Sequence, residues 1–478
     1  MPLRIYNTLA RELEEFQPLE PGKARVYACG PTIYDYPHIG NFRTFIVSDL
    51  LHRYLEWSGY EVRFVTNLTD VDDKVIRGAR DRGVSIGEYV EPFGSAYLGD
   101  LETLGIKPVD AYPRATEYIE AMVDWVRKLE EKGLAYQTPD GSVFFPIAKF
   151  PEYGKLSRID PEAIRPGARV ADDDYGKEDV RDFALWKAAK PEDEATGAAW
   201  DSPWGRGRPG WHLECSVMSI VELGETLDIH LGGEDLVFPH HEDEIAQSEG
   251  VTGQPFVRYW MHVKHLRLEG EKMSKSLGNT VSVGDLVKRG FDPSAIRHQL
   301  LSAQYRRELN FTMEGLEASA RAVQRLLDFH ARLEGAPTGG DPSPTRIPIL
   351  AEEALDRFRA GMDDDLNSAE AMAALFIFLN GVNAELDRAG GAVREADREV
   401  GLGALESMDQ VLGLVELALA GRTVDGATEA WIEEQIQARK EARAVRDFAA
   451  ADAIRDALAD RGIVLEDSPD GTRWKVVK

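Results

Sequence analysis

The two cysteines of this chain and one histidine-rich acidic segment supply the side chains best suited to bind a metal ion. Cys29 and Cys215 are the only cysteines among 478 residues, and residues 239–244 read Pro-His-His-Glu-Asp-Glu. Zinc in proteins takes thiolate and imidazole ligands with an occasional carboxylate. In a reducing compartment, two cysteines so far apart favour a metal site or buried thiols over a disulfide. Composition leaves both alternatives open.

The spacing within residues 239–244 restricts which donors can act together. If a helix begins near Pro239, His240 and Glu244 lie one turn apart on the same face, and with the two cysteines they could close a tetrahedron. The remaining polar residues of the segment would then point elsewhere: His241, Glu242 and Asp243. A solvated helix face is the alternative interpretation of this segment.

Three other segments could bind a nucleoside triphosphate. Residues 29–41 place His38 and Gly40 at a predicted strand-to-helix turn, where backbone donors attract phosphate and a glycine permits close approach. Residues 271–279 place Lys272 and Lys275 on a loop that could stabilise departing pyrophosphate, although an exposed Lys/Ser loop has the same composition. Residues 232–235 end in Asp235, whose carboxylate could bind ribose hydroxyls.

The elements that position these residues follow from hydrophobic periodicity. A β-rich segment at residues 23–29, a helical spacing at 43–58 and a second strand at 62–66 form a βαβ unit, the unit of a parallel sheet. Pro and Gly interrupt residues 105–209, as expected of an insertion, and strand and helix signals return at 210–250. We predict a doubly wound, Rossmann-like α/β fold.

The chain beyond residue 335 is mostly helical. Residues 335–344 have a Gly/Pro-rich linker composition, Asn367 and Glu370 predict a helix start, and residues 463–477 predict a hairpin around a Ser-Pro-Asp-Gly turn. We therefore expect a helical bundle and a small mixed α/β module. The predicted divisions are residues 1–105 and 210–265 for the two halves of the catalytic domain, 106–209 for the insertion, 266–320 for the lysine loop and stem-contact region, 321–425 for the bundle, and 426–478 for the C-terminal module.

Composition restricts the class of protein. Hydrophobic residues make up 43% and charged residues 29%, which is typical of globular protein, and the length favours several domains. We find neither a run of about 18 apolar residues nor an apolar signal segment, so we expect a cytoplasmic protein without a membrane partner. The net charge of −27 repels nucleic acid unless basic residues gather locally. A C-terminal basic cluster could serve this purpose or form a solvated helix face: Arg439, Lys440, Arg443, Arg446, Arg455 and Arg461.

Five separated motifs, in order, resemble those of the cysteinyl-tRNA synthetase family, a group of class I aminoacyl-tRNA synthetases. They are Cys-Gly-Pro-Thr at 29–32, Asn-Leu-Thr-Asp-Val-Asp-Asp-Lys at 67–74, Pro-Gly-Trp-His-Leu-Glu-Cys at 209–215, Phe-Pro-His-His-Glu-Asp-Glu at 238–244 and Lys-Met-Ser-Lys-Ser at 272–276. The resemblance runs essentially from end to end, from Tyr-Asn-Thr-Leu at 6–9 to Gly-Thr-Arg-Trp at 471–474.

The resemblance implies a role for each matching position. The implied zinc ligands are Cys29, Cys215, His240 and Glu244. The implied cysteine pocket is Gly30, Thr32, Thr69 and Trp211. The implied ATP-binding residues are His38, Gly40, Gly233, Asp235 and Lys275. The implied catalytic residues are His38, Asn41, Lys272 and Lys275, and the implied anticodon contacts are Arg443 and Asp452. Asn41 stands where the signature often has a second histidine, and Leu231 stands where a glycine is common.

The implied activity is that of a cysteine–tRNA ligase. Such an enzyme activates L-cysteine with ATP and Mg²⁺ and transfers it to the terminal ribose 2′-hydroxyl of tRNA(Cys), and we expect it to act as a monomer. One Zn²⁺ per chain would select the substrate thiolate, because zinc favours sulfur over a neutral hydroxyl. No editing domain is then required.

Two other functions fit part of the pattern. A ligase that joins cysteine to an amino-sugar inositol in mycothiol synthesis shares the catalytic motifs, but we expect it to lack the long tail from about residue 353. A catalytically inactive paralogue that binds RNA would have lost a zinc ligand or a signature residue, and this chain retains them.

Overall fold

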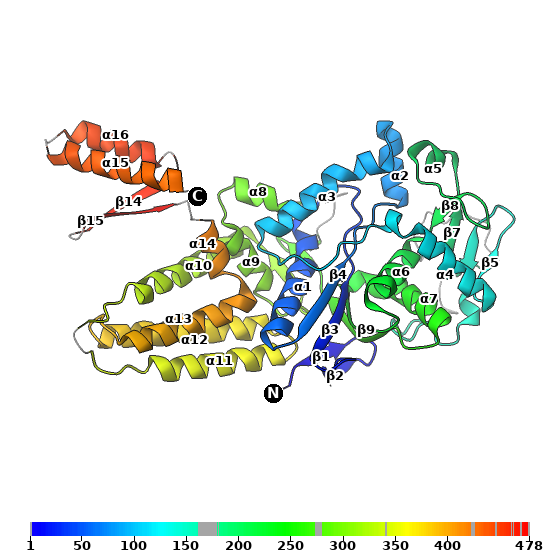
Figure 1. The fold of residues 1–478 in the computed structure, drawn as a ribbon, viewed down its shortest axis with the longest axis horizontal. Coiled ribbons are helices and arrows are strands. Elements are labelled where there is room, and N and C mark those ends of the chain that lie inside the picture. Colours follow the sequence, from blue (N-terminus) through cyan, green and yellow to red (C-terminus); the bar gives the residue numbers. More distant parts are fainter. Residues whose placement is uncertain are drawn as a thin grey trace.

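A four-stranded parallel sheet lies at the centre of the computed structural model (Figure 1). The strand order is β10-β9-β3-β4, formed by Val257–Val263, Leu227–Gly233, Lys23–Ala28 and Glu61–Thr66. The model describes residues 2–160, 179, 181–272, 280–339, 342–421, 426–444, 447–459, 461, 463–468 and 471–476. Helices α1 (Ile39–Trp57), α6 (Trp211–Leu223) and α7 (Glu242–Thr252) contact the strands or one another. The predicted Rossmann-like α/β fold is confirmed.

Helix α1 begins four residues earlier than the apolar spacing predicted, at Ile39 rather than residue 43. The reason is a local hydrogen bond: the His38 backbone N–H donates to Asn41 Oδ1 at 3.1 Å and closes the first turn. The helix is buried on nearly all sides, so no one-sided apolar pattern marks the residue at which it begins.

Helices α2 (Asp73–Arg82) and α3 (Ile86–Thr103) follow β4 and precede the predicted insertion. The insertion contains α4 (Ile119–Glu131) and α5 (Pro191–Thr196). Its own antiparallel sheet has the order β5-β6-β7-β8: Tyr136–Gln137, Val143–Phe145, Phe183–Ala188 and Gly207–Pro209. In Figure 1 this small sheet lies on the side of the central sheet opposite the helical bundle.

Short elements connect the sheet domain to the bundle. They are the hairpin β1 (Arg4–Asn7) and β2 (Glu12–Glu15), the sheet β12-β11-β13 (Glu271–Lys272, Leu266–Leu268, Leu309–Phe311), and helices α8 (Val283–Lys288) and α9 (Pro293–Leu301). Asp365, which precedes α12 (Ser368–Arg388), joins β1 to the segment before β13. It accepts hydrogen bonds from the Tyr6 N–H at 2.8 Å and from the Tyr305 hydroxyl at 2.6 Å.

The bundle consists of five helices: α10 (Met313–Glu334), α11 (Ile347–Asp363), α12 (Ser368–Arg388), α13 (Glu395–Leu412) and α14 (Val415–Ala420). By length and composition alone, α12 could cross a membrane, with a mean hydropathy of 1.2. Half of that stretch is buried, and α12 packs against α11 and α13 with Leu375 and Leu379 inside. It is a packed helix of the bundle.

A small C-terminal module is set off from the bundle in Figure 1. Helices α15 (Gly426–Ala444) and α16 (Phe448–Ala459) pack together, and β14 (Ile463–Ser468) pairs with β15 (Gly471–Val476) in the hairpin expected there. Ile432, Leu458 and Ile463 form a hydrophobic cluster separate from the main core. The module therefore has its own small core.

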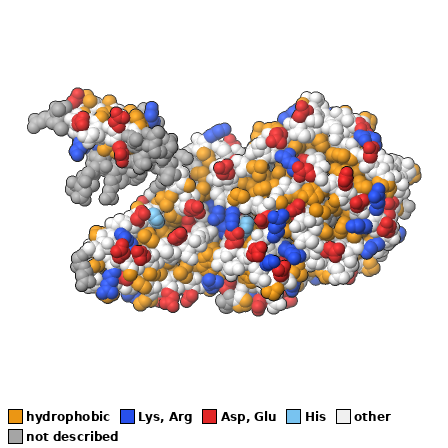
Figure 2. Space-filling model, viewed as in Figure 1, with side chains coloured by type: hydrophobic (Ala, Val, Ile, Leu, Met, Phe, Trp, Pro, Cys, Tyr) orange, Lys and Arg blue, Asp and Glu red, His pale blue; other side chains and the backbone are white. Residues whose placement is uncertain are grey.

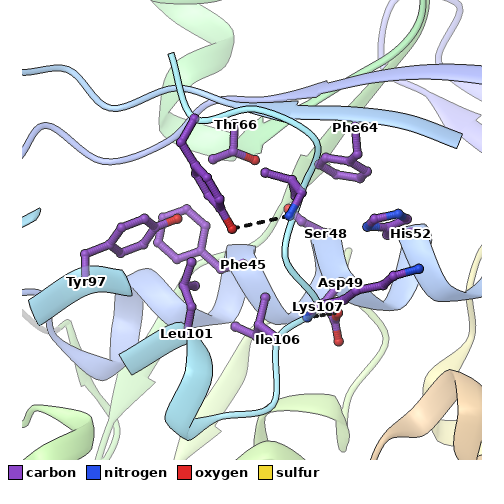
Figure 3. A pocket seen from close by; sticks show the side chains of 12 residues that line it. Phe45, Ser48, Asp49, His52, Phe64, Thr66, Tyr97, Leu101, Ile106 and Lys107 are labelled. Atoms are coloured by element: carbon purple, nitrogen blue, oxygen red, sulfur yellow. Dashed lines mark hydrogen bonds between the residues drawn. The ribbon is translucent and has the colours of Figure 1, made fainter. Parts of the chain in front are cut away.

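A buried arginine on α9 joins the sheet domain to the bundle. Arg297 donates to the carboxylate of Asp49 on α1, to the Leu412 carbonyl at the end of α13 at 2.6 Å, and to the Leu104 carbonyl after α3 at 3.3 Å. Asp49 also accepts from the Lys107 backbone N–H at 2.8 Å, drawn in Figure 3 beside a cavity of about 20 Å³. Four separate segments therefore depend on one ion pair.

We expect Arg297→Met to lower the free energy of unfolding by about 3–5 kcal/mol, because it leaves the Asp49 carboxylate buried without its main cation. Urea denaturation followed by circular dichroism measures the loss. The control is Arg206→Met, which removes an exposed ion pair with Glu194 and should leave the midpoint unchanged. Equal midpoints for the two variants would contradict this role of Arg297.

Candidate active site

The strand end of β3 and three later segments bring four metal-binding side chains together. Cys29 directly follows β3, Cys215 lies on α6, His240 lies in the turn Val237–His241, and Glu244 lies in the first turn of α7. One ligand atom from each lies within 4.8 Å of the others, and all four residues are buried. These are the four donors that the sequence singled out.

The distances suit a tetrahedral ion. Cys29 Sγ lies 3.8 Å from Cys215 Sγ, and a tetrahedron with zinc–sulfur bonds of about 2.3 Å separates two sulfurs by about 3.8 Å. His240 Nε2 lies 3.0 Å from Glu244 Oε1. The donor set therefore has the chemistry and the spacing that zinc requires.

A second set of donors overlaps the first. Cys29, His230, His241 and Glu244 also place one ligand atom each within 4.8 Å of the others, with Cys29 Sγ 3.4 Å from His241 Nε2. The expectation that His241 points elsewhere is wrong. Val237–His241 is an irregular turn in which Phe238 is extended, and α7 begins only at Glu242, so both histidines can face the thiols. A regular helix would have separated them.

The two acidic residues between the ligand candidates do bond elsewhere. Glu242 accepts hydrogen bonds from the backbone N–H groups of Gly154 at 2.8 Å and Ser157 at 2.7 Å. Asp243 accepts from the Tyr153 hydroxyl. Both carboxylates therefore anchor the insertion to α7.

Further histidines surround the four donors and orient them. His230 Nε2 lies 2.8 Å from Glu244 Oε2, which leaves the other carboxylate oxygen toward the thiols. His262 Nε2 lies 2.8 Å from His241 Nδ1, and His212 Nδ1 lies 2.9 Å from His240 Nδ1. Partners of this kind fix ligand orientation in metal sites.

Sequence reasoning missed three of these histidines: His212, His230 and His262. A signal was present, because six of the ten histidines lie between residues 212 and 265. Their proximity depends on the pairing of β9 with β10, in which His230 stands opposite Trp260 and Gly232 stands opposite His262. Spacing along the chain does not show this register.

Electrostatics of the cluster favour a cation. A hydrogen bond from Cys29 lowers the pKa of the Cys215 thiol to about 6. Burial alone would raise the pKa of Glu244, but the neighbouring His230 and His240 lower it to about 2. One thiolate and one carboxylate are therefore buried side by side.

The residues expected to hold the amino acid lie beside this cluster. The loops after β3 and β4 pair in extended form, with a bridge between Thr32 and Thr69. A Cβ added to Gly30 would lie 1.7 Å from the Asn67 carbonyl oxygen, so only glycine permits this approach. Trp211 begins α6 one turn before Cys215 and stacks on His240 with ring centroids 4.3 Å apart.

The residues expected to hold ATP gather at the carboxyl ends of β3 and β9. His38 precedes the N-terminus of α1, and Gly40 lies in its first turn. Gly233 ends β9, and its Cβ would lie 2.5 Å from Asp235 Oδ1 in the turn Glu234–Leu236. In open α/β sheets this edge is where ligands bind.

The segment after the lysine loop lies against the start of α1. Lys272 ends β12, and the Ile39 N–H at the start of α1 donates to the Val281 carbonyl at 2.8 Å. Lys275 lies outside the described residues. Leu231, at the position where a glycine is common, is fully buried in β9, and its carbonyl accepts from the Cys29 N–H at 3.0 Å.

The residues expected to contact the anticodon lie in the C-terminal module. Arg443 is exposed near the end of α15, and Asp452 is exposed on α16, where it pairs with Arg455 at 3.0 Å. On the face drawn in Figure 2, acidic and basic side chains of the described residues are interspersed, so the net charge of −27 forms no single patch on that face.

Family models match the chain in three consecutive stretches. The model for the class I (C) tRNA synthetase catalytic domain matches residues 15–321, the DALR domain matches 357–416, and the cysteinyl-tRNA ligase anticodon binding domain matches 426–474. The fold is similar to that of Mycobacterium tuberculosis methionyl-tRNA synthetase in complex with methionyl-adenylate, with a TM-score of 0.59 at 16% identity over 83% of this chain and 92% of that chain.

Full-length relatives are more similar still. The cysteine–tRNA ligase of Koribacter versatilis is 45% identical over 504 residues, covering 99% of this chain and 100% of the relative. That of Symbiobacterium thermophilum is 48% identical over 483 residues, with the same coverage. The sheet and the catalytic-domain match define a class I aminoacyl-tRNA synthetase. Within that class, the full-length identities decide the group: the chain belongs to the cysteine–tRNA ligase family.

We expect Asn41→Ala to lower the free energy of unfolding by about 1 kcal/mol, because it removes the acceptor for the His38 N–H at the start of α1. Asn41→Asp keeps an acceptor and should preserve the denaturation midpoint. A loss of stability in Asn41→Asp equal to that in Asn41→Ala would show that the hydrogen bond is not what stabilises this turn.

Proposed function

We propose that this enzyme joins L-cysteine to tRNA(Cys) in two steps, through cysteinyl-adenylate formed from ATP with Mg²⁺. The observation that carries the proposal is the set of four buried donors within 4.8 Å of one another, with Trp211 stacked on His240 beside them. The match of residues 426–474 to an anticodon-binding domain supports tRNA, rather than an amino sugar, as the acceptor.

The metal is zinc, held by Cys29, Cys215, His240 and Glu244. When bound, it supplies a Lewis acid that favours a substrate thiolate over a neutral hydroxyl. This set includes both thiols, whereas the set with His230 and His241 includes one, and zinc favours sulfur. In this assignment His230 and His241 orient the ligands Glu244 and Cys29.

The chain's own groups at the sheet edge bind ATP. The α1 N-terminus and His38 lie where phosphate is attracted, the Asp235 carboxylate receives the ribose hydroxyls, and Lys272 and Lys275 neutralise charge on the phosphates. Phosphoryl transfer of this kind requires positioning and charge neutralisation more than a protein nucleophile. The substrate carboxylate attacks the α-phosphorus, and pyrophosphate leaves as cysteinyl-adenylate forms. The tRNA 2′-hydroxyl then attacks the acyl carbon, forming the ester while AMP and the hydroxyl proton leave.

We expect Cys215→Ser to reduce bound zinc from one per chain to well under half, and to reduce cysteine-dependent ATP–pyrophosphate exchange at least about a hundredfold, because a serine hydroxyl is a poor zinc ligand. Elemental analysis and exchange on the same sample measure both. His330→Ala, on the bundle helix α10, is the control. Full zinc content in Cys215→Ser would contradict the assignment of this ligand.

We expect Arg443→Ala to weaken aminoacylation about tenfold or more and to leave ATP–pyrophosphate exchange intact, because a side chain in the anticodon module acts on tRNA alone. Arg443→Lys keeps the charge but loses the planar pair of donors that reads a base edge. Rescue by lysine would assign Arg443 to phosphate binding, and an equal fall in exchange would remove it from the tRNA contacts.

A further inference from the structure

A buried carboxylate near the residues expected to hold the amino acid has one oxygen atom without a hydrogen bond in the described part of the chain. Glu214 lies in the first turn of α6 and is 1% exposed. Its Oε2 atom makes no hydrogen bond within the part of the chain that the structure describes. Glu214 follows Trp211 by three residues, so the two side chains are neighbours on the surface of α6.

The charges around Glu214 are of its own sign. The acidic groups that act on its carboxylate are Cys215, Asp72 and Asp70. Asp70, by contrast, is satisfied by the Thr116 N–H at 3.0 Å and the Thr116 hydroxyl at 2.6 Å. A buried acid in such surroundings is stabilised by a cation that arrives with a ligand.

Thr69 completes the surroundings of this carboxylate. Thr69 Oγ1 accepts from Asn67 Nδ2 at 3.2 Å, and the Asn67 side chain is itself fixed by the Gly30 N–H at 2.8 Å. The Thr69 hydroxyl donates toward the Glu214 carboxylate. A hydroxyl has two acceptor lone pairs, so Thr69 retains one for a further donor.

We propose that Glu214, with the Thr69 hydroxyl beside it, receives the α-ammonium group of the amino-acid substrate. This inference rests on the proposed function. The thiol and the ammonium of cysteine are carried by neighbouring carbon atoms, so a site that holds the sulfur at Cys29 and Cys215 must hold the ammonium next to it. Glu214 is the carboxylate at that place with an unused oxygen.

Three thiol compounds distinguish the binding of the ammonium group from the binding of the rest of the substrate. Cysteine carries thiol, ammonium and carboxylate, cysteamine lacks the carboxylate, and 3-mercaptopropionate lacks the ammonium. Their dissociation constants are measured by calorimetry on the zinc-loaded wild-type enzyme, Glu214→Gln and Asp70→Asn. Asp70→Asn is the matched control, because it removes a neighbouring buried charge whose oxygens are already occupied.

We expect Glu214→Gln to weaken cysteine and cysteamine about ten- to hundredfold, and to weaken 3-mercaptopropionate less than about twofold, because an amide cannot replace a carboxylate facing an ammonium. Asp70→Asn should change all three alike and by little. Equal effects of Glu214→Gln on all three thiols, or a selective effect of Asp70→Asn of the same size, would overturn the assignment.

Zinc content and thermal melting are recorded for every variant. If Glu214→Gln loses zinc or fails to fold, Thr69→Val decides, because it removes the neighbouring hydroxyl and should weaken cysteine and cysteamine but spare 3-mercaptopropionate. An unselective effect of Thr69→Val then overturns the inference. Wild-type enzyme that binds none of the thiols contradicts the proposed function instead, so the two failures are distinguishable.

Discussion

The burial of two thiols and a carboxylate around one point is the constraint on which the rest of the active site depends. Ionised thiolates and carboxylates cost free energy in a low-dielectric interior unless a cation is bound beside them. The chain meets the constraint with imidazoles from α6, β9, β10 and the turn before α7, which hold each donor in a fixed direction. The residues expected to hold the amino acid and the donor cluster therefore share α6, through Trp211 and Cys215.

The rest of the fold positions the donor cluster beside the proposed ATP-binding edge of the sheet. Strand β3 ends at Ala28 and α1 begins at Ile39, so residues 29–38 join the first thiol of the cluster to the start of the proposed ATP site. Arg297 and Asp49 then fix α1 against the bundle. Because α1 is buried along most of its length, a shift of the bundle would be transmitted to the proposed ATP site at the start of this helix.

Much of the fold was predictable from local pattern, and part of the site was not. The βαβ unit followed from strand and helix periodicities, and the C-terminal hairpin followed from its turn sequence. Residue type and one assumed helical spacing made the four donors candidates, and the family resemblance assigned them, although α7 begins at Glu242 rather than near Pro239. The predicted start of α1 was wrong because the helix is buried on nearly all sides. The predicted direction of the His241 side chain was wrong because residues 237–241 do not form a regular helix. His230 and His262 required the register of two strands that are far apart in sequence.

The central claim is that the buried donors select the substrate through a zinc ion. The most direct measurement is ATP–pyrophosphate exchange with cysteine and with serine, before and after zinc is removed by a chelator and restored. The account predicts that exchange with cysteine disappears with the zinc and returns with it, while serine is not activated in either state. Metal-free enzyme that still activates cysteine in preference to serine would contradict the account.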